Sequence, residues 1–273
     1  EPEPEPAPPV IIGYNISTAV GSGGVSFGNQ GFSGDGEPAT EAQLTHPLGL
    51  VFDLLGNMYI SDSSNHRIRK VDTNGYISTI AGRGNTMSTD NGYSGNNGPA
   101  TSAEMEYPTG LTIDSTGNNL YVSDSGNHVV RRINFSDDKI YLVAGTGTSG
   151  NGEDNVHATL SKLKNPGQLA FDSNGDLYIS ETGNFRIRKV NMSTGKINTI
   201  VGSTDGYNGF SGDGGPAIEA RLLDVGGIDF DSNGDLYIAD SSNHRIRKVD
   251  MSTGIISTVA GSGTGGPYGA GRG

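Results

Sequence analysis

The stretch SDSSNHRIRKVD at residues 61–72 returns almost letter for letter as ADSSNHRIRKVD at residues 239–250. Weaker copies are SDSGNHVVRRIN at 123–134 and SETGNFRIRKVN at 180–191. A polar, basic strand that occurs four times in one chain is either a repeated chemical site or a building block of a repeat fold. The segments on either side of it distinguish these two interpretations.

Each copy lies within a larger unit of four strand-like segments. The segments are short, rich in Val, Ile, Tyr and Phe, and bounded by turn residues. Sequences such as SNG and STG join them, so each unit is predicted to be a four-stranded antiparallel meander. One meander cannot bury both of its faces, so the recurrence predicts an all-β protein, a β-propeller with four four-stranded blades. The first segments of the four units are GLVFD at 49–53, GLTID at 110–114, QLAFD at 168–172 and GIDFD at 227–231.

Composition agrees with this fold and excludes several function classes. The chain has 273 residues, 33% of them hydrophobic, and 44 glycines, which suits short strands joined by tight turns. No apolar run approaches 18 residues, so membrane insertion is not expected. There is no cysteine, which excludes disulfides and thiolate metal sites. The net charge of −12 disfavours nucleic acid as a partner and favours cations or basic partners.

The two ends differ from the middle. Residues 1–10, EPEPEPAPPV, are typical of a polyproline II spacer or docking strap. Residues 262–273 are glycine-rich and typical of a flexible tail. The propeller is therefore expected over residues 11–261. The first residue is Glu1, which suggests a processed product or an excised segment.

The repeat resembles the NHL repeat, which is named after an Asn-His-Leu signature. The leucine is replaced by Arg or Val here, and the long linker GFSGDGEPATEAQL at 31–44 recurs at 92–105 and 209–222, with a degraded copy at 150–163. This long-linker form is similar to NHL proteins of the secreted or cell-surface type. The resemblance implies a propeller that commonly has six blades, although only four full units are present. The signature pairs are Asn65-His66, Asn127-His128, Asn184-Phe185 and Asn243-His244.

A fifth copy of the fourth segment, YNISTAVG at 14–21, precedes the first full unit. It predicts one extra N-terminal strand, and an exposed apolar strand edge is an association hazard. Residues 11–21 could close the propeller within the chain or complete a blade of the next copy in a filament. The chain could also be one segment of a longer array.

The repeated polar residues have an architectural interpretation. Eleven of the 18 Lys and Arg residues lie in the third segments, and an acid precedes each group. Arg can lay its stem on apolar neighbours and fork onto a carboxylate, while Asn can fix the turn before the strand. The alternative, a repeated catalytic site, is less favoured because catalysis usually needs asymmetry around one pocket. The predicted network contains Asp62, Asn65, Arg67, Asp124, Asn127, Glu181, Asn184, Arg186, Asp240, Asn243 and Arg245.

Calcium is a weaker alternative for other carboxylates. Calcium favours clustered oxygens on flexible loops, but no complete EF-hand pattern is present, and Asp, Asn and Gly also serve plain turns. The candidates are Asp35 and Asp213 in the linkers and Asp172, Asp176, Asp231 and Asp235 in the DSNGD turns. No cofactor other than this one is expected. The PATEAQL part of the linker is predicted to form one helical turn with its alanines and leucine packed inward.

No catalytic motif is evident. His46 and His157 lie outside the repeat, and the chain has neither an HxH nor an HExxH motif. Sequons at Asn15, Asn134 and Asn191 are possible glycosylation sites on a secretory route. We therefore expect a non-enzymatic extracellular or cell-surface interaction module, which associates with itself or a surface partner through an exchanged strand and the proline-rich strap. A propeller enzyme of the lyase or lactonase type, with a metal in the central channel, is the alternative.

Overall fold

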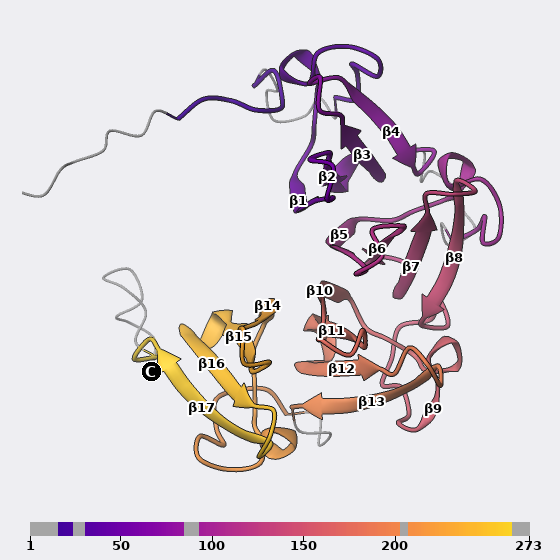
Figure 1. The fold of residues 1–273 in the computed structure, drawn as a ribbon. Helices are drawn as coiled ribbons and strands as arrows, with labels where there is room; N and C mark the ends of the chain where they lie inside the picture. Colours follow the sequence, from indigo (N-terminus) through magenta and orange to yellow (C-terminus); the bar gives the residue numbers. More distant parts are fainter. Residues whose placement is uncertain (1–15, 24–30, 85–92, 203–206, 264–273) are drawn as a thin grey trace, which may run out of the picture.

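The structure is a computed structural model that describes residues 16–23, 31–84, 93–202 and 207–263. Four antiparallel sheets stand side by side around an open arc, with the first and last sheets at its two ends (Figure 1). The predicted all-β propeller of four four-stranded blades is therefore confirmed. Residues 1–10 and most of the glycine-rich tail lie outside the described residues.

Each blade is a meander whose strands follow chain order from the hub to the rim (Figure 1). Blade 1 contains β1 (Pro47–Phe52), β2 (Met58–Asp62), β3 (Arg67–Val71) and β4 (Ile77–Ala81). Blade 2 contains β5 (Pro108–Ile113), β6 (Asn119–Asp124), β7 (Val129–Asn134) and β8 (Lys139–Ala144). Blade 3 contains β10 (Pro166–Phe171), β11 (Leu177–Glu181), β12 (Arg186–Val190) and β13 (Lys196–Val201). Blade 4 contains β14 (Val225–Phe230), β15 (Leu236–Asp240), β16 (Arg245–Asp250) and β17 (Ile255–Ala260).

The linker before each blade forms a single 3-10 turn, as predicted, and its first alanine is buried. The turns are η1 (Ala39–Glu41), η3 (Ala100–Ser102), η4 (Ala158–Leu160) and η6 (Ala217–Glu219). In three linkers a proline precedes the turn and makes only an isolated bridge to the rim strand, because proline has no N–H to donate. In the third linker His157 replaces proline, and a short fifth strand, β9 (Val156–His157), pairs with β13.

Further 3-10 turns lie between the second and third strands of three blades: η2 (Ser63–Asn65), η5 (Thr182–Asn184) and η7 (Ser241–Asn243). None of the helices in the described parts of the chain is long and apolar enough to cross a membrane.

The hydrophobic core lies between blades rather than within them. Tyr59 and Ile68 of blade 1 share a buried cluster with Leu111 of blade 2. The same arrangement joins blade 2 to blade 3 and blade 3 to blade 4. Full burial of a side chain of this size contributes about 1.5–3 kcal/mol, so each blade depends on its neighbour for stability.

Glycines at the hub let neighbouring inner strands approach closely. A Cβ on Gly110 would clash with the carbonyl oxygen of Gly167 in blade 3. Gly227 has the corresponding position in β14, one residue before Ile228, and a Cβ there would meet nothing within 4 Å. The difference arises because blade 4 is the last in the arc.

The predicted extra N-terminal strand needs a correction. Residues 14 and 15 lie outside the described part, and residues 16–23 carry no strand assignment. Gly21 N–H nevertheless donates to Ala39 O at 2.9 Å, as Gly82 N–H donates to Ala100 O at 3.0 Å one blade further on. The segment therefore occupies the place of the end of a preceding rim strand. The described residues include no neighbouring strand on which it could form a ladder.

Candidate functional site: a repeated ion-pair network and two open faces

The repeated acid of each blade is a buried acceptor that joins the linker to the blade. Asp62 is fully buried and accepts the N–H of Thr45 at 2.7 Å and the amide of Asn65 at 2.9 Å. Asn65 also donates to Gly31 O in the linker. The same acid-to-backbone bond recurs as Glu106 N–H to Asp124, Lys164 N–H to Glu181 and Leu223 N–H to Asp240, at 2.7–2.8 Å.

A fully buried arginine completes each network, and sequence reasoning did not single it out. Arg69 lies 3.4 Å from Asp62, and its other amino group donates to Asp35 at 2.8 Å. Alternation puts Arg67 and Arg69 on the same side of β3, but only Arg69 is completely buried. Its counterparts are Arg131, Arg188 and Arg247, each with no exposed surface.

The arginines predicted from the sequence have a different place. Arg67 donates to Gly82 O at 3.1 Å and stacks over the Phe32 ring at 3.8 Å. Arg245 likewise covers Phe210 at 3.7 Å. Arg186 is the exception, since its Nε lies 2.7 Å from Glu181, whose side chain is one methylene longer than Asp. The predicted asparagines all contact their acids: Asn65, Asn127, Asn184 and Asn243.

Burial sets the electrostatics of this network. Desolvation raises the pKa of Asp124 to about 6, although Arg131 and three donated hydrogen bonds oppose the shift. The pKa of Asp62 is raised for the same reason. Asp62, Asp124, Glu181 and Asp240 have no exposed surface and are enclosed by structural partners in the described part of the chain.

Histidines link one blade to the next. His66 Nδ1 accepts the N–H of Tyr107 in the following linker at 3.2 Å, and His128 Nδ1 accepts the N–H of Asn165 at 3.3 Å. Desolvation lowers the pKa of both histidines, which keeps the acceptor nitrogen unprotonated at neutral pH. The NHL signature therefore supplies an inter-blade hydrogen bond. Periodicity placed a histidine at this position in three of the four blades, with Phe185 in the third, but gave no sign of the histidines' partners.

The calcium candidates are engaged with cationic side chains. Lys189 Nζ lies 3.0 Å from Asp172 and 2.8 Å from Asp176. Lys248 Nζ lies 2.7 Å from Asp235 and 3.8 Å from Asp231. Asp35 and Asp213 pair with Arg69 and Arg247. Within the described ranges no three His, Asp or Glu side chains converge as a metal site would require, and calcium binding stays a prediction.

Two of the three sequon asparagines are placed by the structure. Asn134 donates its side-chain amide to Asn119 at 2.9 Å, and Asn191 donates to Asp176 at 3.2 Å. A glycan at either position would replace one of these contacts. Asn15 lies outside the described residues, and glycosylation stays a prediction.

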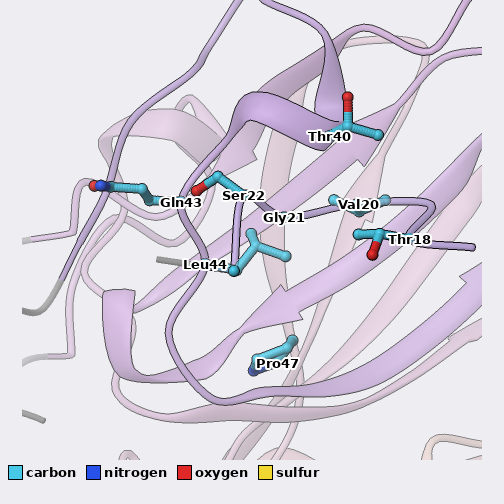
Figure 2. A pocket seen from close by; sticks show the side chains of 9 residues that line it. Thr18, Val20, Gly21, Ser22, Thr40, Gln43, Leu44 and Pro47 are labelled. Carbon is cyan, nitrogen blue, oxygen red and sulfur yellow. The ribbon is translucent and has the colours of Figure 1, made fainter. Parts of the chain in front are cut away.

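In blades 2, 3 and 4 one face packs against the preceding blade. The corresponding face of blade 1 is exposed. We call it the first-blade face and define it by Leu44, Pro47, Leu50 and Phe52. Leu50 is 58% exposed, whereas its counterpart Leu111 is 6% exposed. Beside this face, residues 18–23 and the first linker line a pocket of about 500 Å³ (Figure 2). Val20 fills the position that Ala81 takes at the next blade boundary.

In blades 1, 2 and 3 the other face packs against the following blade. The corresponding face of blade 4 is exposed. This last-blade face is defined by Tyr237, His244, Ile246 and Ala260. Ile246 is 38% exposed, whereas its counterparts Ile68, Val130 and Ile187 are completely buried under the next blade. His244, Ile246 and Ala260 line a depression of about 330 Å³. Both ends of the arc therefore carry apolar surface that the fold buries at every internal boundary.

Comparison with known proteins places this arrangement in a family. The sequence matches the family described as the teneurin NHL domain over residues 14–208 and 204–265. The chain belongs to the teneurin NHL domain family. Mouse Teneurin-4 is 34% identical over 241 residues, which are 82% of this chain but 8% of Teneurin-4. The teneurin NHL match thus confirms the NHL resemblance, and the chain spans only a small part of this relative.

Solved structures support the fold of this teneurin NHL domain. An auxiliary nutrient binding protein from Bacteroides thetaiotaomicron aligns with a TM-score of 0.59 and 20% identity, over 80% of this chain and 49% of that one. A putative gluconolactonase aligns with a TM-score of 0.53 and 13% identity, over 80% of this chain and 63% of that one. Such low identities show a common fold and do not carry over a function.

Proposed function

We propose that the chain is a non-enzymatic interaction module that works outside the cell or at its surface and binds copies of itself or a surface partner. Membership of the teneurin NHL domain family carries this proposal. Teneurin-4 is far longer than this chain, so the role of the whole relative is not transferred. The net charge of −12 supports a protein partner over nucleic acid.

The hydrogen bonds and ion pairs of the repeated polar residues support an architectural role for the network. Each of the four acids and each of the four buried arginines has backbone and side-chain partners in its own blade and linker. The strands nearest the hub read PLGLVF, PTGLTI, PGQLAF and VGGIDF and contain one ionisable residue, Asp229. A repeated network with so few chemical groups at the hub favours binding over catalysis.

We extend the proposal to the N-terminal region. Segment 16–23 takes the place of a rim strand that belongs to a preceding blade, which supports its exchange with an incoming strand. The proline-rich strap at residues 1–10 would hold a partner by preformed polyproline II structure. Loss of either region should therefore change association without changing the fold of the four blades.

Bead clustering tests this function. Beads coated with the chain should cluster with one another, or bind to cells that display the chain, more than beads coated with the same mass of serum albumin. Removal of residues 1–23 should alter clustering, while the far-ultraviolet circular dichroism spectrum stays the same. Beads that neither cluster nor bind to any displayed protein would contradict the proposal.

The alternative function is a propeller lactonase or lyase with a metal at the hub. A putative gluconolactonase has the same fold, and this alternative rests on that likeness alone. Incubation with a panel of lactones, with and without calcium or manganese, distinguishes the two functions. Metal-dependent hydrolysis that the Asp229→Asn variant abolishes would establish the enzyme; the interaction module predicts no turnover above the buffer rate.

A further inference from the structure

One row of side chains in blade 2 departs from the repeat. Tyr121 on β6, Arg132 on β7 and Tyr141 on β8 are cross-strand partners, so they share one face of the sheet. Tyr121 meets Phe171 of blade 3 edge to face, with ring centroids 5.0 Å apart, so this face is turned toward blade 3. We call Tyr121, Arg132 and Tyr141 the blade 2 row.

The other blades differ in composition at the same register. Their rows place a lysine between a tyrosine and a serine or asparagine: Tyr59–Lys70–Ser78, Tyr178–Lys189–Asn198 and Tyr237–Lys248–Ser257. Of the four described blades, only blade 2 has an arginine between two tyrosines. The repeated residues serve architecture, so a change at two neighbouring positions of one blade indicates a role that the other blades do not share.

The arginine of this row lacks the ion pairs of two of its counterparts. Lys189 and Lys248 each pair with two carboxylates in the first hairpin of their own blade. In blade 2 Asn119 replaces the second carboxylate, and its amide donates to Asp114, the first, at 2.6 Å. No carboxylate in the described ranges pairs with Arg132, so its charge and N–H donors are left for a ligand.

The boundary between blades 2 and 3 is hollowed beside this arginine. Arg132 lies beside the hydroxyl of Tyr121 and stacks over the Tyr141 ring, 4.8 Å from its centroid. It lines a pocket of about 240 Å³, and blade 3 contributes Val190 and Met192 to the same pocket. A hydrogen bond from a guanidinium to a carboxylate is stronger in such partly dry surroundings than in open water.

We propose that this pocket binds an acidic side chain of a partner protein, with its carboxylate on Arg132 and its stem between the tyrosines and Met192. The inference rests on the interaction module proposed above and names the chemistry of its partner. Both walls of the pocket belong to internal blades.

Charge elsewhere on the molecule narrows the choice of partner. The net charge of −12 repels a polyanion, so one acidic residue suits the pocket better than an acidic run. Tyr121 and Met192 also line a second hollow of about 330 Å³, which contains Asp114 and Asp172. A segment that extends from the first hollow into the second meets these two carboxylates. The ligand is therefore a segment with a single acidic residue among apolar residues, continued by neutral or basic ones.

Titration with a small carboxylate tests the pocket by itself. In ¹H–¹⁵N NMR spectra, hexanoate should shift the Arg132 Nε–H resonance and the backbone amides of Tyr141 and Met192. Hexanamide, which has the same chain without the charge, should leave them in place. Arg132→Gln should abolish the hexanoate shifts, and Lys70→Gln is the matched control, because Lys70 has the same place in blade 1 and does not line this pocket.

A random peptide library displayed on phage tests the chemistry of the partner. We would select peptides on the wild-type chain and discard those that also bind Arg132→Gln. The enriched peptides should share one acidic residue beside apolar residues and carry no net negative charge. Exchange of that acid for its amide in a selected peptide should weaken binding about tenfold or more, as expected for a lost hydrogen bond between charged groups.

A second variant guards against misfolding as the cause of lost binding. Tyr141→Ser restores the residue that blades 1 and 4 carry at this place, so it should keep the circular dichroism spectrum and still weaken the selected peptide. Equal shifts with hexanoate and hexanamide, or enriched peptides that have no common acid and bind equally to Arg132→Gln, would overturn the pocket. The interaction module survives either result if coated beads still cluster or bind to cells, whereas inert beads contradict the module itself.

Discussion

Replacement of Asp124 by alanine should be among the most destabilising single changes in this protein. Asp124 is fully buried and accepts three hydrogen bonds. They come from Glu106 N–H at 2.7 Å, the Asn127 amide at 3.0 Å and Arg131 Nη1 at 3.3 Å. Alanine leaves all three donors without this acceptor and leaves the charge of Arg131 without a counter-ion.

The expected loss follows from these contacts. Breaking a buried ion pair by removing one partner costs about 3–5 kcal/mol. Arg131 keeps two carbonyl acceptors, Glu104 O at 2.7 Å and Ser94 O at 2.9 Å, so the lower half of that range applies. A loss of about 3–4 kcal/mol is a large part of the 5–15 kcal/mol by which domains are usually stable.

Urea unfolding followed by circular dichroism measures this loss. Asp137→Ala, in the exposed hairpin of the same blade, is the matched control and should leave the midpoint nearly unchanged. Asp124→Asn keeps one acceptor oxygen and should be intermediate. A folded Asp124→Ala variant that loses less than about 1 kcal/mol would refute the structural role of the network.

Three further predictions concern stability. His66→Phe should cost about 1 kcal/mol through the lost inter-blade bond, whereas Phe185→His should be neutral or stabilising, as thermal denaturation would show. Gly110→Ala should cost about 1–3 kcal/mol, but Gly227→Ala should not, because only the first meets the next blade; equal urea midpoints would contradict this. Since burial raises the folded-state pKa of Asp124 to about 6, the folded state binds more protons between pH 4 and 6. The contribution of this residue to stability therefore falls as pH rises through that window and is constant above it, and Asp124→Asn should remove this dependence in urea titrations.

The sequence was sufficient to predict the blades, because alternation and turn residues repeat in each of them. Leu111, Leu169 and Ile228 recur at one register and are buried together with their neighbours. The linker turns were equally predictable, because the first alanine of the PATEAQL part recurs in each linker. Repetition supplies the same local signal four times, so a weak signal in one unit is corrected by the others.

The partners of the polar residues were harder to predict. The basic group of each third strand was recognised, but Arg69 rather than Arg67 contacts Asp62. Both arginines lie on one side of the strand, and only Arg69 is completely buried under the linker. The linker's path over the blade is a tertiary property. The sequence also placed His66 in the repeat but did not reveal that it accepts a hydrogen bond. Its donor, the N–H of Tyr107, is 41 residues further along the chain.

The N-terminal segment shows another limit of sequence reasoning. YNISTAVG matches the rim strands in pattern, yet residues 16–23 form no ladder in the structure. A strand pattern states what a segment could pair with and not whether a pairing edge is present. The open faces were also invisible to the sequence, since Leu50 and Leu111 are the same residue type and differ only in what covers them.

Hydrogen exchange of four backbone amides tests the central claim most directly. Thr45, Glu106, Lys164 and Leu223 lie in linkers outside regular strands, and each donates its N–H to the repeated acid of its blade. If these acids join the linkers to the blades, all four amides should exchange as slowly as the central strands, as NMR would record. Exchange at the rate of exposed loops would contradict the claim.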